Sequence, residues 1–249
     1  MNSVNALIWD DLTQPFRCFG PLVTVEEVLR GDLAAGMGSY DARAVAGLTA
    51  MARYAAEFLT SGHAELGRSG AVCPFTSGAI QRGLLRMTAS DLETLDQGLL
   101  VDAVDYFRRT FREAGELKSD PSEIYRSIII VFPALPELPG RTLIERVQKS
   151  LKPAYVDDGL MIGEFYPGCG ASGLHNPDFR PLNAPVTSLA IRHMTIWDGP
   201  FMVEDERFVQ SFRRRFGEEG AKRIAALQKR GAGASSSRRS DGEDARQHV

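Results

Sequence analysis

The stretch GLMIGEFYPGCGASGLHNPDFRPLNAPVTSLAIRHM, residues 159–194, decides the fold. It opens with an apolar strand pattern at 159–167 and closes with another at 186–194. About twenty residues join the two, which is too few for a crossover that contains a helix and too many for a tight turn. We therefore expect the two strands to be antiparallel neighbours in one sheet, joined by a structured loop.

Two further strands are expected earlier in the chain. The run GLLRMTA at 83–89 is short and apolar, and SIIIVFP at 127–133 is β-branched, as in a fully buried strand. Helical spacing fills the intervals between the first three strands. The order predicts an α+β (or α/β) fold, in which a mixed, partly antiparallel sheet of four strands packs with helices.

Local signals set the expected helix ends. Ser90-Asp91-Leu92-Glu93 has the spacing of a capping box, so a helix is expected from Ser90 to about Ala114. The apolar face at 143–151 predicts another helix, which Pro153 is expected to stop. A last helix is expected at 208–227, with a basic polar face.

The N-terminal part, residues 1–70, is predicted to be a helical layer. Thr24 to Glu27 has the spacing of a capping box, and 41–59 carries apolar residues at helical spacing. Residues 71–229 would form the sheet-containing core, so that 1–229 make a single globular domain. The rest, 230–249, is rich in Gly, Ser and charge, and a segment of that composition is expected to be disordered.

Composition narrows the class of protein. The net charge of −3 gives no basic field for nucleic acid, and no apolar run of membrane-spanning length is present. The N-terminus does not resemble a secretory signal, and Cys18, Cys73 and Cys169 show no CxxC spacing. We expect a cytoplasmic protein with a small-molecule substrate and no nucleic-acid or membrane partner; the sequence leaves a homo-oligomer open.

The loop of the opening stretch holds the candidate catalytic residues His175, Asp178 and Arg180. Prolines at four-residue intervals restrict the loop, so an ordered structure is expected. His175 is a candidate acid or ligand, and Arg180 needs water, a carboxylate or an anionic ligand. The alternatives are structural: Asn176 and Asp178 are turn formers, and Arg180 would pair with Asp178 or Glu164.

Three residues are candidates for binding a cofactor: His193, Arg192 and Cys73. Strand alternation puts Arg192 and His193 on opposite faces, so one of them faces inward. An inward His193 suits a metal or heme ligand, or a core hydrogen bond. Cys73 precedes a small-residue turn at 76–78; a helix opening there would activate its thiol, and the alternative is a small buried hydrophobe. No P-loop, Rossmann, Gly-x-Ser-x-Gly or His-Glu-x-x-His motif is present, and no structural metal site is predicted.

The sequence resembles an uncharacterised bacterial family, a domain of unknown function. The resemblance rests on VCPFTSGAI, LKPAYVDDGLMIGEFYP and GLHNPDFRPLNAPVTSLAIRHM, followed by an aspartate and PFM, and it runs from about Val72 to Met202. Members of that family often lie in neighbourhoods of specialised-metabolite genes. The resemblance therefore implies a tailoring enzyme.

A looser resemblance links the chain to the YqcI/YcgG-type family, some members of which are heme-dependent enzymes that oxidise amino-acid nitrogen. The shared order is an early Cys-Pro patch, an IIIVF-like strand, a GEFYP-like strand and a later strand that ends near a histidine. Where that family tends to have His-Pro, this chain has Tyr166-Pro167, so the axial ligand would be His175 or His193. Arg180 or Arg192 would hold a substrate carboxylate or a heme propionate.

Three functions follow as hypotheses. The first is a heme-dependent tailoring oxidoreductase that acts on a small polar or amino-acid-derived substrate. The second is a cofactor-free isomerase or cyclase, with His175 as acid and Asp178 or Glu164 as base. The third is a non-catalytic ligand-binding protein in which the loop is purely structural.

Overall fold

The computed structural model of the chain describes residues 18–34, 40–93, 95–113 and 120–243, and side chains as far as residue 229. The chain divides into two compact units, 1–193 and 194–249, each of which is described by itself. The single domain expected for 1–229 stays a prediction.

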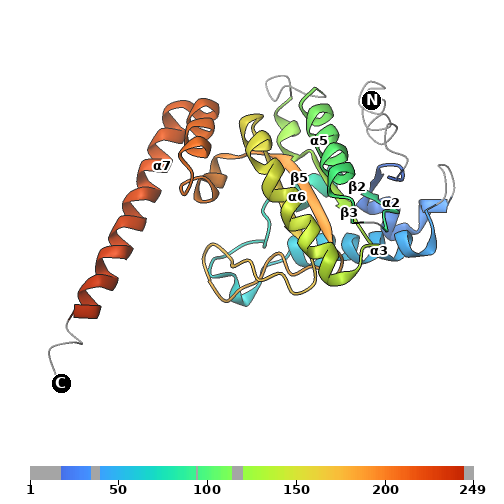
Figure 1. Cartoon of the computed structure of the whole chain (residues 1–249), viewed down its shortest axis with the longest axis horizontal. Helices are drawn as coiled ribbons and strands as arrows, with labels where there is room; N and C mark the ends of the chain where they lie inside the picture. Colours follow the sequence, from blue (N-terminus) through green and yellow to red (C-terminus); the bar gives the residue numbers. More distant parts are fainter. Residues whose placement is uncertain (1–17, 35–39, 94, 114–119, 244–249) are drawn as a thin grey trace. The chain divides into compact units, whose positions relative to one another are not determined.

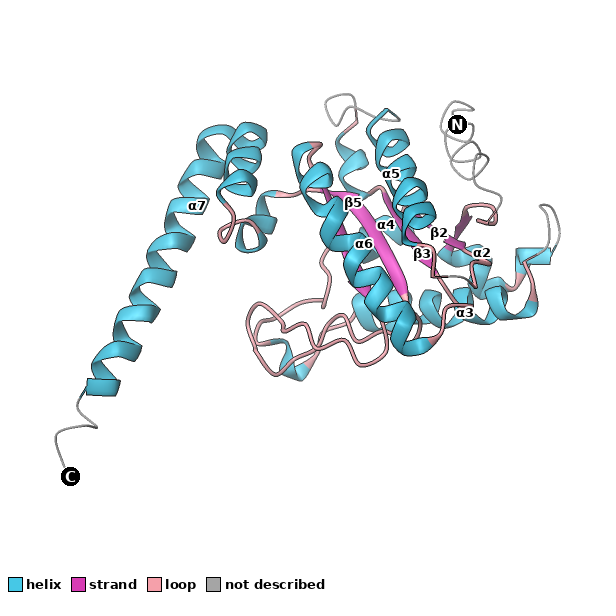
Figure 2. Cartoon of the chain, in the orientation of Figure 1, coloured by secondary structure: helices cyan, strands magenta, loops and turns pink. Residues whose placement is uncertain are grey.

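A mixed sheet of five strands forms the centre of the first unit (Figure 2). The strands lie in the order β1-β2-β3-β5-β4, where β2 and β3 are parallel and β5 is antiparallel to both of its neighbours. This confirms the α+β prediction and the antiparallel pair made by the last two strands. The strands are β1 (Val23–Thr24), β2 (Leu85–Ala89), β3 (Ser127–Val131), β4 (Leu160–Phe165) and β5 (Ser188–His193).

The prediction of four strands was wrong by one, because β1 was missed. β1 has only two residues, Val23 and Thr24, which pair with Met87 and Arg86 of β2. Two residues are too few to show the alternation by which a strand is recognised in sequence. Thr24 is also the N-cap of the following helix, and both halves of the predicted capping box form there.

The main helices of this unit lie on the two faces of the sheet (Figure 1). α5 and α6 cover one face, which we call the closed face, and α2, α3 and α4 pack on the other. α3 continues without a break into a π-helical segment, η2. The helices are α2 (Val25–Arg30), α3 (Ala42–Arg53), η2 (Tyr54–Leu59), α4 (Thr76–Gln81), α5 (Gln97–Glu113) and α6 (Glu137–Asp157), with short 3-10 segments at Asp32–Ala34, Ala64–Leu66 and Pro121–Tyr125.

Two predicted helix ends were wrong. α5 begins at Gln97 rather than at Ser90, because the Ser90 hydroxyl accepts a hydrogen bond from Leu92 N, two residues on, in a local turn. Pro153 lies inside α6 and does not stop it. A proline interrupts only the bond to the carbonyl four residues earlier, and the buried Tyr155 and Val156 hold the last turn against the core.

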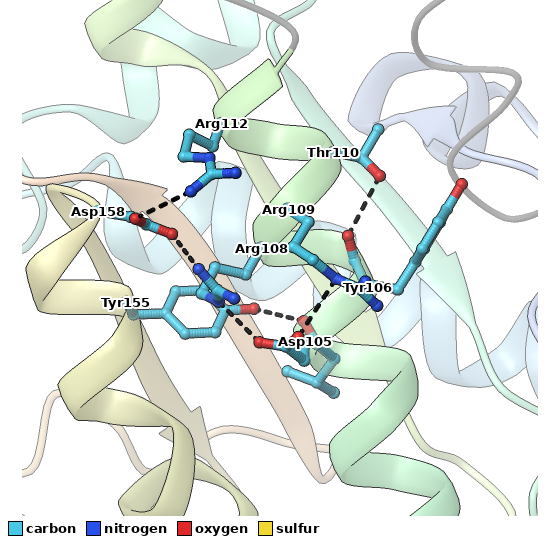
Figure 3. Close-up of polar contacts among 9 residues, drawn as sticks. Asp105, Tyr106, Arg108, Arg109, Thr110, Arg112, Tyr155 and Asp158 are labelled. Carbon is cyan, nitrogen blue, oxygen red and sulfur yellow. Dashed lines mark hydrogen bonds and ion pairs between the residues drawn. The ribbon is translucent and has the colours of Figure 1, made fainter.

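The closed face is fixed by a polar network between α5 and α6 (Figure 3). Arg108 lies between two carboxylates, with Nε 2.7 Å from Asp105 and a terminal nitrogen bonded to Asp158 at the end of α6. Beneath it, the buried Tyr155 hydroxyl donates to Val104 O at 2.7 Å. These bonds join the two helices and hold them together over the closed face.

The second unit consists of a 3-10 segment, η5 (Ile196–Phe201), and the long helix α7 (Glu206–Glu243). Non-helical angles at Gly217 (φ 56°, ψ −134°) divide α7. The backbone is helical as far as Glu243, within the segment 230–249 for which the sequence predicts disorder. A helix rich in Gly and Ser is marginal in water, so disorder in solution stays a prediction.

Among the residues that the structure describes, no helix combines the length and apolarity that crossing a membrane requires.

Candidate functional site

The face of β4 and β5 that lies opposite α6 forms a half-buried surface. The antiparallel register pairs Met161 with Arg192 and Gly163 with Ala190, and puts Phe165 beside them. We call these five residues the floor. All five are half-buried. Their apolar neighbours on the closed face, among them Ile162 and Ile191, are at most 4% exposed.

The centre of the floor is open. A Cβ added to Gly163 would meet nothing closer than Phe165 Cε2, at 3.8 Å. Glycine within a strand often marks a place where another group approaches the backbone closely. Its partner Ala190 contributes only a methyl group. The centre of the floor therefore has room for a methyl group that it does not carry.

Arg192 lies at one end of the floor, beside the segment that contains Cys73. Its guanidinium carbon is 6.0 Å from the ring centroid of Phe75, and one terminal nitrogen donates to His193 O at 2.9 Å. Phe75 follows Cys73 by two residues, and Cys73 N donates to Leu59 O at 2.8 Å. The predicted helical turn after Cys73 is present as α4. The structure thus places Phe75, two residues after the predicted site residue Cys73, beside the predicted site residue Arg192.

Tyr54 stands at the other end of the floor, and sequence reasoning missed it. Its ring is 6.4 Å from that of Phe165, edge to face, and its hydroxyl donates to Pro181 O of the β4–β5 loop. Burial raises the pKa of Tyr54, and the neighbouring thiols of Cys169 and Cys73 raise it further. The phenol therefore stays protonated at neutral pH and acts as a donor.

The sequence gives little indication that Tyr54 belongs to the site. It lies in the expected helix 41–59, but its phenol is polar, so it is not one of the apolar residues that define the buried face. Its place depends on η2, because π-helical turns rotate side chains away from the positions that α-helical spacing predicts. Such turns are frequent at functional sites. Periodicity alone does not reveal them.

His193 lies away from the floor, on the closed face. It is 4% exposed, and its ring centroid is 4.9 Å from that of Phe111 in α5. Arg192 and His193 thus occupy opposite faces, as predicted. A heme on His193 would have to replace packed core side chains, so this residue does not fit as an axial ligand. Arg192 and His193 also cannot serve one heme together.

Two of the three predicted catalytic residues lie at the surface of the β4–β5 loop, and the third bonds to the backbone of the loop. His175 and Asp178 are exposed. Arg180 donates to the carbonyls of Pro177 and Phe179, so it braces the loop that contains it. Asp178 N donates to Asn176 Oδ1 at 2.9 Å, the turn-forming role that was the alternative interpretation of Asn176.

The loop is ordered by contacts with the segment that follows η2 (Figure 2). Asn176 Nδ2 donates to Glu65 O at 2.8 Å. The ring centroid of the buried Phe179 lies 4.9 Å from that of His63 and 6.2 Å from that of Phe58. His63, which the sequence analysis did not single out, is therefore part of the aromatic support of the loop.

A tight turn begins the loop at Tyr166-Pro167-Gly168-Cys169. Cys169 N donates to Tyr166 O at 3.1 Å, and Gly168 has φ +76°, an angle that favours glycine. Asn183 Oδ1 accepts from Gly168 N at 2.8 Å. The loop thus begins as a defined turn, which ends at the buried Cys169.

A second polar group lies between α6 and the end of β4. Tyr166 donates to Glu145 Oε1 at 2.5 Å, and Arg141 Nε is 3.2 Å from the same oxygen. Burial raises the pKa of Glu164, and nearby Glu145 raises it further. Glu164 faces away from the floor because it alternates with Gly163 and Phe165 along β4. It therefore cannot act as a base there.

Comparison with known families gives one match. The family model described as "Domain of unknown function (DUF6875)" matches residues 48–227, well over half of the chain. The chain belongs to this family. Every floor residue, together with Tyr54, Cys73 and the whole β4–β5 loop, lies within the match. Neither the curated proteins nor the solved structures gave a match.

Proposed function

We propose that this protein is an enzyme that binds a small carboxylate substrate on the floor and transforms it without a heme. One observation carries the proposal: Arg192, the segment that contains Cys73, and Tyr54 lie around a half-buried sheet surface whose centre, Gly163, carries no side chain. A concave or open apolar surface with a few convergent polar groups is the usual form of a small-molecule site.

Each polar group has a role that its chemistry supports. Arg192 would hold the substrate carboxylate through paired hydrogen bonds. Tyr54, held protonated by burial, would exchange its bond to Pro181 O for a hydrogen bond or proton donated to a developing negative charge. Cys73 would take up a proton from the substrate as a thiolate and return it as a thiol, as an isomerase or cyclase reaction without external electrons requires.

The exposed His175 and Asp178 belong to the same proposal as residues of the loop beside Tyr54. Their roles as acid and base stay predictions, since the only support for them is their place in a loop that Pro181 joins to Tyr54. A tailoring role in bacterial specialised metabolism is the wider setting that we propose, on the resemblance alone.

The first experiment tests where carboxylates bind. We would titrate a panel of small carboxylates and measure the melting temperature of the wild type, Arg192→Gln and the control Arg109→Gln. Arg109 is an exposed arginine of α5 that pairs with Asp105, so the control matches the charge change away from the floor. Stabilisation lost only in Arg192→Gln is expected. Equal stabilisation of all three proteins would overturn the proposal.

Heme dependence is tested by one spectrum. We expect no sharp Soret band at stoichiometric hemin, because His193 is packed in the core. A stoichiometric band that disappears in His175→Ala would replace our proposal with the heme-dependent oxidoreductase.

A further inference from the structure

The floor also indicates the class of substrate. We infer that it takes a carboxylate that carries a planar aryl group on a short linker, such as an aromatic oxo acid. This inference rests on the proposed function, since it assumes that the floor is the binding site. Three features of the floor support it.

The first feature is a flat centre. Gly163 and Ala190 face each other across β4 and β5, so the middle of the floor carries nothing larger than a methyl group. The nearest atom to a Cβ on Gly163 would be the Phe165 ring, at 3.8 Å. A planar ring could lie over this pair, whereas a thick saturated group would meet the side chains at either end.

The second feature is the aromatic border. Phe165 and Tyr54 stand edge to face at 6.4 Å at one end, and Phe75 stands beside Arg192 at the other. Phe75 is itself 6.4 Å from Tyr125. Aromatic pairs gain roughly 0.5–1.5 kcal/mol beyond the burial of their area, so such a border favours an aryl group over an alkyl group of equal size.

The third feature is the distance between the cation, Arg192, and the centre of the floor at Ala190. Arg192 and Ala190 are two residues apart on one strand face, which places them roughly 7 Å apart along β5. A ring over Ala190 would therefore reach the guanidinium with a carboxylate on a short linker. The five floor residues include one cation and no carboxylate, so the floor favours an anionic ligand over one that needs an ammonium partner.

The test compares three probes by calorimetric titration: phenylpropanoate, cyclohexylpropanoate and the neutral phenylpropanol. We expect phenylpropanoate to bind roughly two- to tenfold more tightly than cyclohexylpropanoate. We expect phenylpropanol, which lacks the charge, to bind most weakly. Gly163→Val should weaken the binding of phenylpropanoate by about tenfold or more, because its side chain occupies the ring position.

The outcomes separate the two proposals. If both carboxylates bind equally well and Arg192→Gln weakens both, the carboxylate site stands and the aryl inference is overturned. If neither carboxylate binds, or Arg192→Gln changes nothing, the proposed function fails as well. Gly163→Ala, which adds one methyl group at an ordinary contact distance from Phe165, gives a second variant should Gly163→Val not fold. A smaller loss of phenylpropanoate binding in Gly163→Ala supports the inference, and unchanged binding overturns it.

Discussion

The two faces of the sheet differ in how completely side chains cover them, and neighbouring residues of β5 display the difference. His193 is 4% exposed and packs on Phe111 beneath α5, whereas Arg192 is half-buried on the floor beside Phe75. On the closed face, β4 and β5 carry mainly large apolar side chains. On the floor they carry Gly163 and Ala190. Packing thus covers β4 and β5 fully on one face and leaves them half-buried on the other, at the floor.

The largest expected effect is on the closed face. Phe111→Ala should destabilise the protein by about 3–5 kcal/mol, because Phe111 is 1% exposed and its removal leaves a cavity beside His193. Urea unfolding followed by circular dichroism measures the change. A loss below about 1 kcal/mol would mean that the closed face is no tighter than the floor.

The second prediction compares two tyrosine hydroxyls. Tyr155→Phe removes a fully buried hydrogen bond to the carbonyl of Val104, which keeps its bond within α5, at a cost of about 1.5 kcal/mol. Tyr54→Phe removes the bond to Pro181 O, which is half-buried, at a cost of about 1 kcal/mol. Both changes remove one oxygen atom, so the same unfolding measurement compares the faces directly. If Tyr54→Phe costs more than Tyr155→Phe, the floor is the more rigid side.

A smaller effect of opposite sign is expected at Gly163. Gly163 does not have a positive φ, and a Cβ there meets only ordinary contact distances. Gly163→Ala should therefore stabilise the fold by about 0.4–1 kcal/mol, since alanine lowers the entropy of the unfolded chain. A higher melting temperature together with weaker carboxylate binding would show that Gly163 is kept for the ligand. A destabilised variant would show that the floor is already filled.

Much of the fold could be predicted from sequence because it depends on local pattern. The runs that became β2, β3, β4 and β5 are apolar or β-branched over five residues or more, and the length of the β4–β5 connection predicted their pairing. The errors came where tertiary contacts override local signals. Ser90 forms a turn instead of starting α5, and α6 continues past Pro153 because its last turn is buried.

The site was harder to predict because its residues meet only in three dimensions. Arg192 and Cys73 were identified by type and position, and alternation placed Arg192 opposite His193. Tyr54 could not be identified, since its direction depends on η2 and its neighbours Cys73 and Cys169 are distant in sequence. For Arg180 the sequence left water, a carboxylate and an anionic ligand open, because its carbonyl partners in the loop are invisible to pattern analysis.

The smallest effect is a pH dependence at the edge of the closed face. Burial, with Glu145 nearby, raises the pKa of Glu164 in the folded state, while Lys152 opposes the shift. The folded state therefore favours the protonated carboxyl. The stability that this protonated carboxyl contributes is complete below the ordinary glutamate pKa of about 4.3. It is lost as the pH rises through the raised pKa of the folded state. Glu164→Gln keeps a neutral side chain at every pH, so its stability relative to the wild type should increase as the pH rises from about 4 to 7. Urea midpoints of both proteins across this range measure the difference, and groups that the two share cancel. A difference that does not change with pH would mean that water reaches Glu164, and that this edge of the closed face is as open as the floor.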